Sequence, residues 1–225
     1  MYPKAERVVR DVLRTRAHLV RQHTSNGLSV QNILVRNTGV RFGVKQMHKV
    51  SKKDLVSLLP AAEQVLAVTS SLAILECLSQ QMKTLAQAVT KRLTHTPAYE
   101  QLLSVKGIEP LLAQTIALET GHSGRFPTVG HSASYCRCVR SIKMSNGKRK
   151  GQGNAKNGHP YLAWAYMEAA QFAIRCSPQV QRFYQQKASK SHLMIARKSV
   201  AHTLARACFD IMRDLVPFEV NKALG

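Results

Sequence analysis

A serine at the start of a glycine-rich basic stretch is the feature of the sequence most suggestive of chemistry. Ser145 precedes Asn146-Gly147 and then the consecutive cations Lys148, Arg149 and Lys150. A serine hydroxyl attacks a phosphodiester when it is positioned and when the developing charge is stabilised. Glycine allows the backbone to bend around a phosphate, which the cations would neutralise. From residue types alone, Ser145 is either such a nucleophile or a merely polar loop residue, and it is favoured over Ser141, which lies in a less glycine-rich segment.

Several basic residues around this serine are candidates for contact with nucleic acid. The stretch from residue 143 to 158, KMSNGKRKGQGNAKNG, cannot be regular structure throughout, because it combines four glycines with three asparagines. Its basic side chains would meet a phosphate backbone. The candidates here are Arg137, Arg140, Lys143, Lys148, Arg149, Lys150 and Lys156.

A second candidate is the segment LLSVKGIEPLLAQTIALETG at residues 102–121. Two apolar helices around a turn of the type apolar-x-Gly-apolar make a helix-hairpin-helix pattern, whose turn amides can hold a phosphate without reading sequence. Gly107 would form the turn and Lys106 would add charge. Glu109 stands where a second glycine is usual, and a carboxylate is unfavourable beside a phosphate. An ordinary turn packed in the core is the alternative.

The C-terminal part of the sequence offers a third basic surface. Arg197 and Lys198, candidate nucleic-acid contacts, share a predicted helix with His202 and Arg206, and Lys187 and Lys190 come before it. Such residues usually form a solvated helix face. The lack of nearby carboxylates instead favours a surface that meets a polyanion.

The sequence does not indicate a metal site or a cofactor in this chain. Cys136 and Cys138 form a C-x-C pair without a second pair at zinc-site spacing, and His131 and His159 have no partners at ligand spacing. The odd count of five cysteines, with no signal peptide before them, favours a reduced cytoplasmic location.

The net charge narrows the class of partner. The chain has 33 Lys and Arg against 12 Asp and Glu, a formal charge of +21, and two long zones almost without acids, residues 12–53 and 120–209. Binding a polyanion offsets the self-repulsion of such a chain by releasing counterions. Nucleic acid is the expected partner, and an anionic membrane surface is the weaker alternative. No 18 consecutive residues are apolar, so no membrane-spanning segment is expected.

Hydrophobic periodicity predicts the helices that position these residues. An Arg-rich helix is expected at 4–24, with breakers at Asn26-Gly27 and at 39–43, and residues 28–36 are either a short helix or an irregular link. Residues 60–94 predict a long helix with apolar positions three and four apart. This helix is either a core helix, folded back on the helix at 192–215, or the seam of a dimer.

The remaining pattern is also helical. No convincing strand alternation appears, so we predict an all-α fold in which a long coiled-coil-like segment precedes a compact helical domain containing the helix-hairpin-helix. Further helices are expected at 98–103, 109–119, 128–139, 159–175, 178–186 and 192–215. The predicted parts are an Arg-rich helix and linker at 1–50, an oligomerisation helix at 51–96, the helical domain with the serine loop at 97–218, and a tail at 219–225.

Three stretches of the sequence resemble transposases of the insertion-sequence 110/116/902 family. They are SVKGIEPLLAQTIALETGHSGRFPTVGHSASYCRCV, SNGKRKGQGNAKNGHPYLAWAYMEAAQFAIR and SVAHTLARACFDIMRDLVPF, which together span roughly residues 97–218. The resemblance is specific in its middle block, where Glu119-Thr120-Gly121, Arg125-Phe126-Pro127 and Tyr161-Leu162-Ala163-Trp164 follow one another in the family's order. The first fifty residues more weakly resemble the family's interdomain segment.

The resemblance implies an RNA-guided recombinase with a serine nucleophile that corresponds to Ser145. It also implies an N-terminal nuclease-like domain, with an Asp-Glu-Asp-Asp tetrad that holds Mg²⁺, and an oligomer that acts on DNA with a structured guide RNA. The tetrad is not matched in this sequence, because Glu6 and Asp11 correspond to positions after its last aspartate.

The expected function is therefore DNA binding in the transposition of an insertion sequence, by a truncated copy without independent catalysis. Expected partners are DNA, a structured guide RNA, and either further copies of the chain or a protein supplying the nuclease-like domain. The expected location is the bacterial cytoplasm, at the nucleoid. A non-enzymatic helix-hairpin-helix protein that binds nucleic acid is the alternative.

Overall fold

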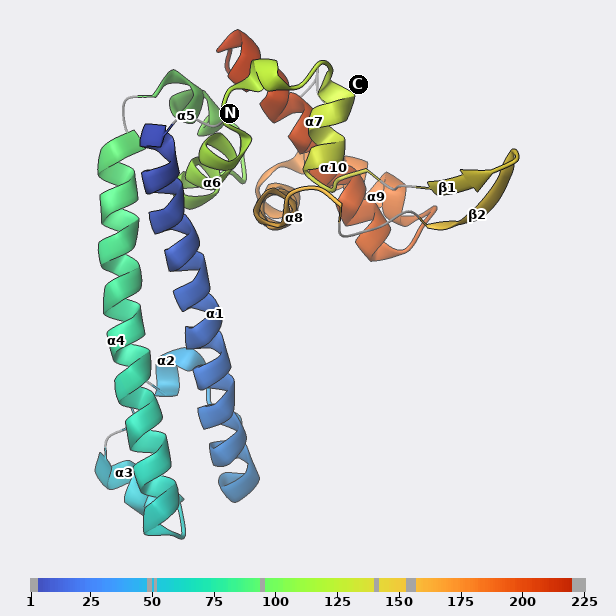
Figure 1. Ribbon diagram of the computed structural model, residues 1–225. Helices are drawn as coiled ribbons and strands as arrows, with labels where there is room; N and C mark the ends of the chain where they lie inside the picture. The colour runs from blue at the N-terminus through green and yellow to red at the C-terminus, as the bar shows by residue number, and fades with distance from the viewer. Residues whose placement is uncertain are drawn as a thin grey trace. The chain divides into compact units, whose positions relative to one another are not determined.

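The helices predicted from periodicity are present, and the fold is all-α apart from one two-stranded hairpin. The computed structural model describes residues 4–47, 50, 52–93, 96–139, 142–152 and 157–219. The elements, shown in Figure 1, are α1 (Lys4–Thr38), α2 (Val44–Met47), α3 (Lys52–Leu58), α4 (Ala62–Leu93), α5 (Pro97–Leu102), α6 (Pro110–Thr120), η1 (Ser123–Arg125), α7 (Val129–Tyr135), β1 (Ile142–Ser145), β2 (Lys148–Gln152), α8 (Pro160–Cys176), α9 (Pro178–Ala188) and α10 (Leu193–Asp214).

The first helix is longer than its sequence suggests. Asn26-Gly27 was expected to break it near residue 24, but α1 continues through Gly27 to Thr38. A glycine inside a helix costs only about 1 kcal/mol relative to alanine, so it weakens a helix without ending it. The breaker that does act is Gly39, whose φ of 68° ends the helix in the left-handed region.

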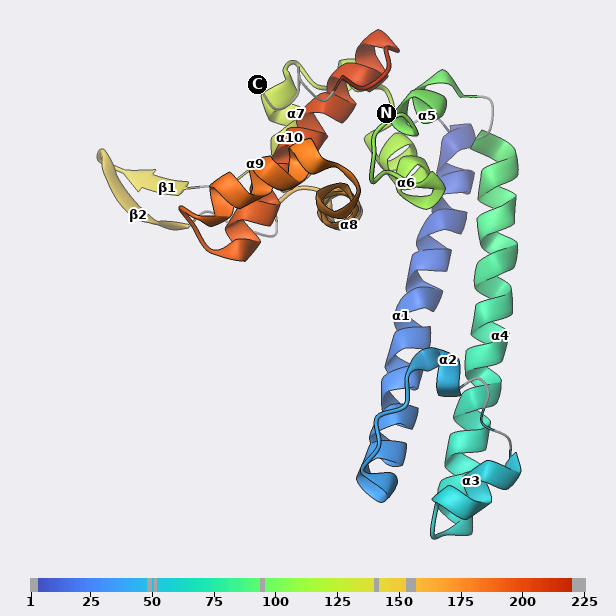
Figure 2. The same cartoon turned by 180° about the vertical axis from the view of Figure 1, so that it is seen from behind.

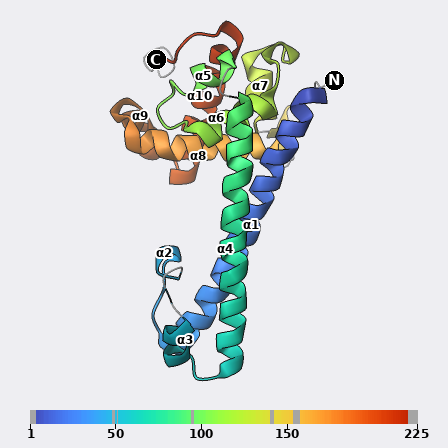
Figure 3. The same cartoon turned by 90° about the vertical axis from the view of Figure 1, so that its left-hand side faces the viewer.

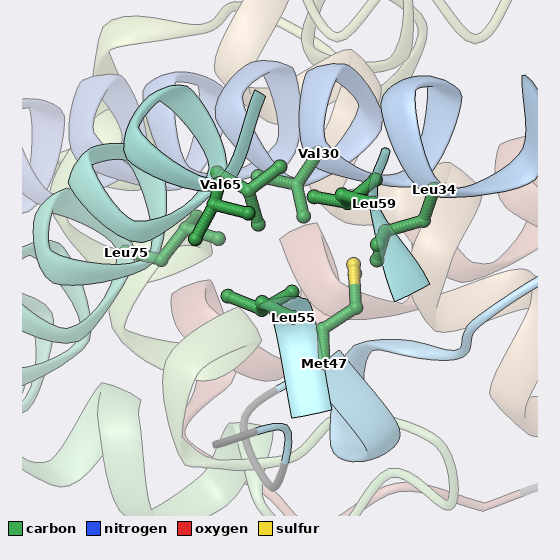
Figure 4. Close-up of a cluster of buried hydrophobic side chains, with 8 residues drawn as sticks. Val30, Leu34, Met47, Leu55, Leu59, Val65 and Leu75 are labelled. Atoms are coloured by element: carbon green, nitrogen blue, oxygen red, sulfur yellow. The ribbon is translucent and has the colours of Figure 1, made fainter. Parts of the chain in front are cut away.

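The chain forms two compact units, each with many contacts between its own residues. One of them comprises residues 8–89. Its core joins α1, α2, α3 and α4 through one cluster of buried apolar side chains (Figure 4). Figure 3 shows α3 beside the first turns of α4, where the cluster gathers. The cluster consists of Val30, Leu34, Met47, Leu55, Leu59, Val65, Val68 and Leu75. One face of α4 is therefore covered by α1 and α3 of the same chain.

Helix α4 is long and apolar enough to be a candidate membrane-spanning helix, although its sequence has no unbroken apolar run. An 18-residue window within Ala62–Arg92 has a mean hydropathy of 1.2, and by length and composition alone it could cross a membrane. Apolar residues in the window alternate with polar ones, which is why no unbroken apolar run exists. Only 17% of the window is buried, so α4 carries apolar side chains on its exposed face as well.

The second unit comprises residues 1–7 and 90–225, with α10 at its centre. The helix α10 packs against α5, α7, α8 and α9, and α8 in turn packs against α6 and α9 (Figures 1 and 2). Both central helices present alanines to their partners, which lets helix backbones approach closely. The buried alanines are Ala165, Ala169, Ala170 and Ala173 in α8, and Ala196, Ala201 and Ala205 in α10.

The glycine-rich basic stretch is more ordered than expected, because part of it forms an antiparallel hairpin. Strand β1 pairs with β2, and the register changes between Lys143 and Met144, so that Lys150 is the extra residue of a β-bulge. Asn146 and Gly147 have φ values of 48° and 70° and make the two-residue turn. Positive φ at both positions is typical of a type I′ turn, for which Asn-Gly is a favoured pair.

Candidate nucleic-acid interface

Ser145 is the last residue of β1 and borders the hairpin turn. Lys148 is its partner across the two strands. Side chains directly opposite in an antiparallel pair start from Cβ atoms about 4.5–5.5 Å apart. Ser145 is partly exposed and Lys148 is exposed. The tip thus places a hydroxyl and an ammonium group on the same face, within reach of one phosphate.

Of the other basic candidates between residues 140 and 156, only Lys150 has a side chain that the structure describes. Lys150, the bulged residue, is exposed, whereas the side chains of Lys143 and Arg149 on the two strands are not described. Arg140 and Lys156 lie outside the described residues. The hairpin glycine Gly147 has open space around its α-carbon, so its role is the positive φ of the turn, and no close packing requires it.

The described residues before and after the hairpin meet at one place, between the end of α7 and the start of α8. The backbone N–H of His159 donates to the carbonyl of Tyr135 at 2.6 Å. A Cβ on Gly158 would lie 2.5 Å from the same oxygen, so this close approach requires glycine, as does its φ of 98°. We call this junction the hairpin base. It brings together the two ends of the segment that carries Ser145.

A contact between a buried glutamate and a histidine holds the hairpin base together. Glu119 is 1% exposed, and its Oε2 lies 3.2 Å from Nε2 of His159. The other ring nitrogen, Nδ1, accepts from the N–H of Leu162 at 3.4 Å and caps α8. With a proton on Nε2, the ring donates to the Glu119 carboxylate while Nδ1 accepts from Leu162. His159 therefore connects the end of α6 with the start of α8.

An arginine and two aromatic rings complete the hairpin base. The guanidinium carbon of Arg125 lies 4.8 Å from the ring centroids of both Phe126 and Tyr135, and its Nη1 donates to the Thr120 carbonyl at 3.3 Å. The Tyr135 ring lies 5.4 Å from the ring of His159. Tyr135 thus connects the cation–π contacts of Arg125 with the Glu119–His159 pair.

The turn between α5 and α6 packs against α8. A Cβ on Gly107, whose φ is 101°, would lie 2.5 Å from the backbone nitrogen of Ala173. Gly107 is therefore required by packing, the alternative considered for this turn. Lys106 and Glu109 are exposed on the same turn, and Glu109 is the N-cap residue of α6 but makes no side-chain cap hydrogen bond. Lys106 remains available for a phosphate, and Glu109 opposes one.

Two of the candidates on α10 are less exposed than a solvated helix face would be, whereas Arg206 on the same helix is exposed. Arg197 and Lys198 are both half-buried, and Nη1 of Arg197 lies 3.8 Å from the sulfur of Met194. Lys198 is close enough to Cys138 to act on the pKa of that thiol. Arg137, also half-buried, has a φ of 56° just beyond α7. Lys198 thus faces residues that precede the hairpin.

Three buried cysteines lie together around Tyr166 without forming a metal site. Burial raises the pKa of Cys138 and Cys208 to about 12 and raises that of Cys136 further, and it also raises the pKa of Tyr166. Their thiols are therefore protonated. Within the part of the chain that the structure describes, no group of three or more His, Cys, Asp or Glu side chains is placed to hold a metal ion.

The hairpin, its base and the α5–α6 turn all lie in one stretch of sequence. Residues 99–185 match the transposase IS116/IS110/IS902 family. The match covers about two fifths of the chain and runs from α5 into α9, so it includes Ser145, Gly107 and the Glu119–His159 pair. A search of curated proteins finds no match to the chain. The transposase-like stretch supports a function related to transposition.

The Glu119–His159 pair was not predicted from the sequence. Both residues lie in stretches that carry the family resemblance, but His159 was considered only as a metal ligand and rejected. One local signal was present: His159-Pro160 precedes an apolar helix, with proline at the first helical position, so a cap at residue 159 could have been predicted. Its contact with Glu119, 40 residues earlier in the chain, has no local signature.

Proposed function

We propose that this chain is a nucleic-acid-binding component of a transposition reaction, in which Ser145 attacks a DNA phosphodiester. The hairpin tip is the observation that supports this role most directly. It holds the serine beside a type I′ turn with Lys148 opposite it, at a partly exposed position. A buried serine, or one without a neighbouring cation, would not be placed for this chemistry.

The proposed step exchanges one phosphoester for another. The Ser145 Oγ forms a bond to phosphorus, the bond from phosphorus to a deoxyribose oxygen breaks, and that oxygen leaves as a hydroxyl. The serine proton passes to a base, and the leaving oxygen takes up a proton. Lys148 would neutralise charge on the phosphate. Because a serine hydroxyl is protonated near neutral pH, the step also needs a base or further activation of the phosphate.

The residues of this chain do not fit the metal that the family resemblance implies. The buried carboxylate of Glu119 is already paired with His159, and no metal-binding group is found among the described residues. No step is therefore assigned to a metal held by this chain. We propose that the activating acidic residues come from a nuclease-like domain outside this sequence, and that this chain alone does not cleave DNA.

The proposed partners are DNA, a structured guide RNA and further copies of the chain. The exposed Lys106 on the α5–α6 turn suits a helix-hairpin-helix contact with a phosphate backbone. The same exposed Lys106 equally supports the second candidate function, a non-enzymatic protein that uses these helices only to bind nucleic acid. The two candidates differ in whether Ser145 ever becomes covalently attached to DNA.

The decisive experiment looks for that attachment. The chain is incubated with a labelled DNA junction, guide RNA and Mg²⁺, with and without the nuclease-like domain of a full-length relative, and covalent protein–DNA products are separated on denaturing gels. We expect an adduct only when the domain is supplied. Ser145→Ala should abolish the adduct and leave DNA binding within about twofold.

Ser141→Ala is the matched control, since it removes the competing serine of the same segment. This variant should form the adduct normally. An adduct that survives Ser145→Ala overturns the assignment of the nucleophile. Persistent DNA binding without any adduct supports the non-enzymatic alternative, and cleavage by the chain alone contradicts the proposed need for a second domain.

A further inference from the structure

A groove between α9 and α10 is lined by none of the residues of the hairpin tip or of the α5–α6 turn. It has a volume of about 590 Å³ and is lined by both helices and by residues 138–139, which end shortly before β1. We call it the α9–α10 groove. A volume of this size lies within the range of about 300–1,000 Å³ that is typical of pockets for small molecules. It could admit a nucleotide, whereas a duplex is much too large to enter it.

The polar part of the α9–α10 groove is cationic. Lys187 and Lys198 line it, and none of the residues that the structure places along it carries a carboxylate. His202 also lines it, but burial and the nearby charge of Arg206 lower the pKa of His202. The two lysines are therefore its cations at neutral pH. An anionic ligand fits this arrangement.

A neighbouring groove has the opposite character. It has a volume of about 500 Å³, shares Phe183 and His202 with the α9–α10 groove, and is lined by three carboxylates, Asp210, Asp214 and Glu219. These carboxylates repel an anion despite the arginines beside them. The charge distribution thus confines an anionic ligand to the side on which Lys187 and Lys198 lie.

Apolar side chains, two of them well exposed, form another part of the wall of the α9–α10 groove, beside the hydroxyls of Ser199 and Thr203. Val139 is 41% exposed and Ile195 is 49% exposed, and both line the groove together with the ring of Phe183. The Lys187 ammonium lies 5.1 Å from the centroid of that ring. A cation and an aromatic ring therefore border the same space. Proteins that bind single strands use this combination to hold a phosphate and to stack its base.

We propose that the α9–α10 groove binds an unpaired nucleotide of a single-stranded nucleic acid. Lys187 and Lys198 hold its phosphate, and the base packs against Phe183 and Ile195. The apolar wall distinguishes a single strand from a duplex, because the faces of paired bases are covered by their neighbours. The inference deepens the proposed function and rests on it, since it assumes that nucleic acid is the partner.

The test compares two double variants that remove the same charge. Lys187→Gln/Lys198→Gln alters the α9–α10 groove. Arg175→Gln/Arg182→Gln removes two exposed cations of α8 and α9 that do not line it. Affinity for an eight-nucleotide oligo-dT and for a duplex of the same length is measured by fluorescence anisotropy at one salt concentration. We expect the groove variant to lose about tenfold in affinity for oligo-dT and the control about twofold, because each lysine loses a direct phosphate contact.

A cross-linking experiment locates the base independently. Oligo-dT with 5-iodouracil is photo-cross-linked to the full chain, and the attached peptide is identified by mass spectrometry. Attachment at Phe183, lost in Phe183→Leu, is the expected result. Attachment exclusively outside α9, α10 and residues 138–139 overturns the proposal.

The outcomes separate this inference from the proposed function. If both double variants lose equal affinity for oligo-dT while the wild-type chain binds both nucleic acids, the groove proposal fails and the proposed function stands. If the wild-type chain binds neither nucleic acid, the proposed function fails as well. If an eight-residue poly-glutamate peptide competes with oligo-dT as well as unlabelled oligo-dT does, the groove selects anions in general, and the nucleotide assignment is wrong.

Discussion

Individual glycines have different physical roles in this chain. Gly107 and Gly158 combine a positive φ with backbone contacts that leave no room for a Cβ, whereas Gly147 only provides the dihedral angle of a turn. Gly27 lies inside α1, and a Cβ there would meet nothing within 4 Å. Glycine is therefore required at positions 107 and 158 and replaceable at position 27.

This difference predicts opposite effects of one substitution. Gly107→Ala should destabilise the unit that contains α5–α10 by about 2–4 kcal/mol, because it adds overpacking against Ala173 to an unfavourable φ. Gly27→Ala should stabilise α1 by about 0.5–1 kcal/mol through helix propensity. Urea denaturation followed by circular dichroism measures both changes, and the fluorescence of Trp164 in α8 reports the unit that contains Gly107. Equal effects of the two substitutions would contradict the packing at Gly107.

The cysteines predict a pattern of thiol reactivity. The thiolate is the reactive form, and burial holds the pKa of Cys138 and Cys208 at about 12. Cys77 and Cys176 are exposed. Titration of the native chain with a disulfide reagent at pH 8 should therefore label two thiols quickly and the other three only after urea unfolding. Rapid labelling of four or five thiols would show that the core around Tyr166 is open.

The same raised pKa values determine how stability depends on pH. Thiols in the unfolded chain ionise near pH 9.0, whereas those of Cys138 and Cys208 remain protonated in the folded chain up to about pH 12. Their contribution to stability is fully present below pH 9 and is lost as pH rises towards 12. The urea midpoint followed by Trp164 fluorescence should consequently fall between pH 8.5 and pH 10.5 in reducing buffer, and this fall should be smaller in Cys208→Ala.

At the scale of elements, α4 carries large apolar side chains that the rest of the chain leaves uncovered. Leu66 and Ile74 are 68% and 48% exposed on the side away from the buried cluster of Val65, Val68 and Leu75. Cys77 is exposed three residues after Ile74. The helix predicted at 192–215 is present as α10, which packs on α8.

We therefore predict that α4 mediates self-association. Light scattering should show a dimer or larger species at tens of micromolar, because pairing two such faces removes apolar surface from water. Leu66→Lys/Ile74→Lys should give a monomer. Gln80→Lys/Gln87→Lys, with the same charge change at exposed polar positions of α4, should not.

A strict monomer in the wild-type chain would contradict this prediction. Oxidative cross-linking through Cys77, absent in Cys77→Ser, would place α4 at the interface. Partition of the wild-type chain into neutral lipid vesicles, lost in Leu66→Lys/Ile74→Lys, would instead indicate that a membrane covers the exposed apolar side chains of this helix.

At the scale of the whole molecule, we predict that the net charge of +21 contributes more to nucleic-acid affinity than any one contact does. If six phosphates are neutralised, the slope of log affinity against log salt on duplex DNA should be about −5. Lys148→Gln/Lys150→Gln should make this slope shallower by about two, since each lost phosphate contact reduces it by roughly one. Filter binding from low to physiological salt measures both slopes. A slope near zero for the wild-type chain would remove the polyelectrolyte argument.

The sequence by itself determined the properties that depend on local pattern and on charge. Apolar residues at helical spacing predicted the helices from 60–94 onward, and the all-α class is confirmed. The Asn146-Gly147 turn also had a local signal, but the polar strands beside it concealed the hairpin, because strands outside the core show no hydrophobic alternation. The sequence pattern also overestimates the effect of Gly27 as a helix breaker. Packing of Val30 and Leu34 against α4 compensates the local cost of a glycine inside α1.

The tertiary structure alone decided the features that depend on contacts between distant residues. Only the packed fold brings Glu119 to His159, presses Gly107 against the backbone of α8, and assembles the α9–α10 groove from residues near 138, 187 and 198. Most of these residues lie tens of residues apart in the chain, so hydrophobic periodicity and motif spacing do not indicate that they are close together in the fold. Such contacts arise from how helices pack on one another, and side-chain shape and burial at the interfaces determine that packing.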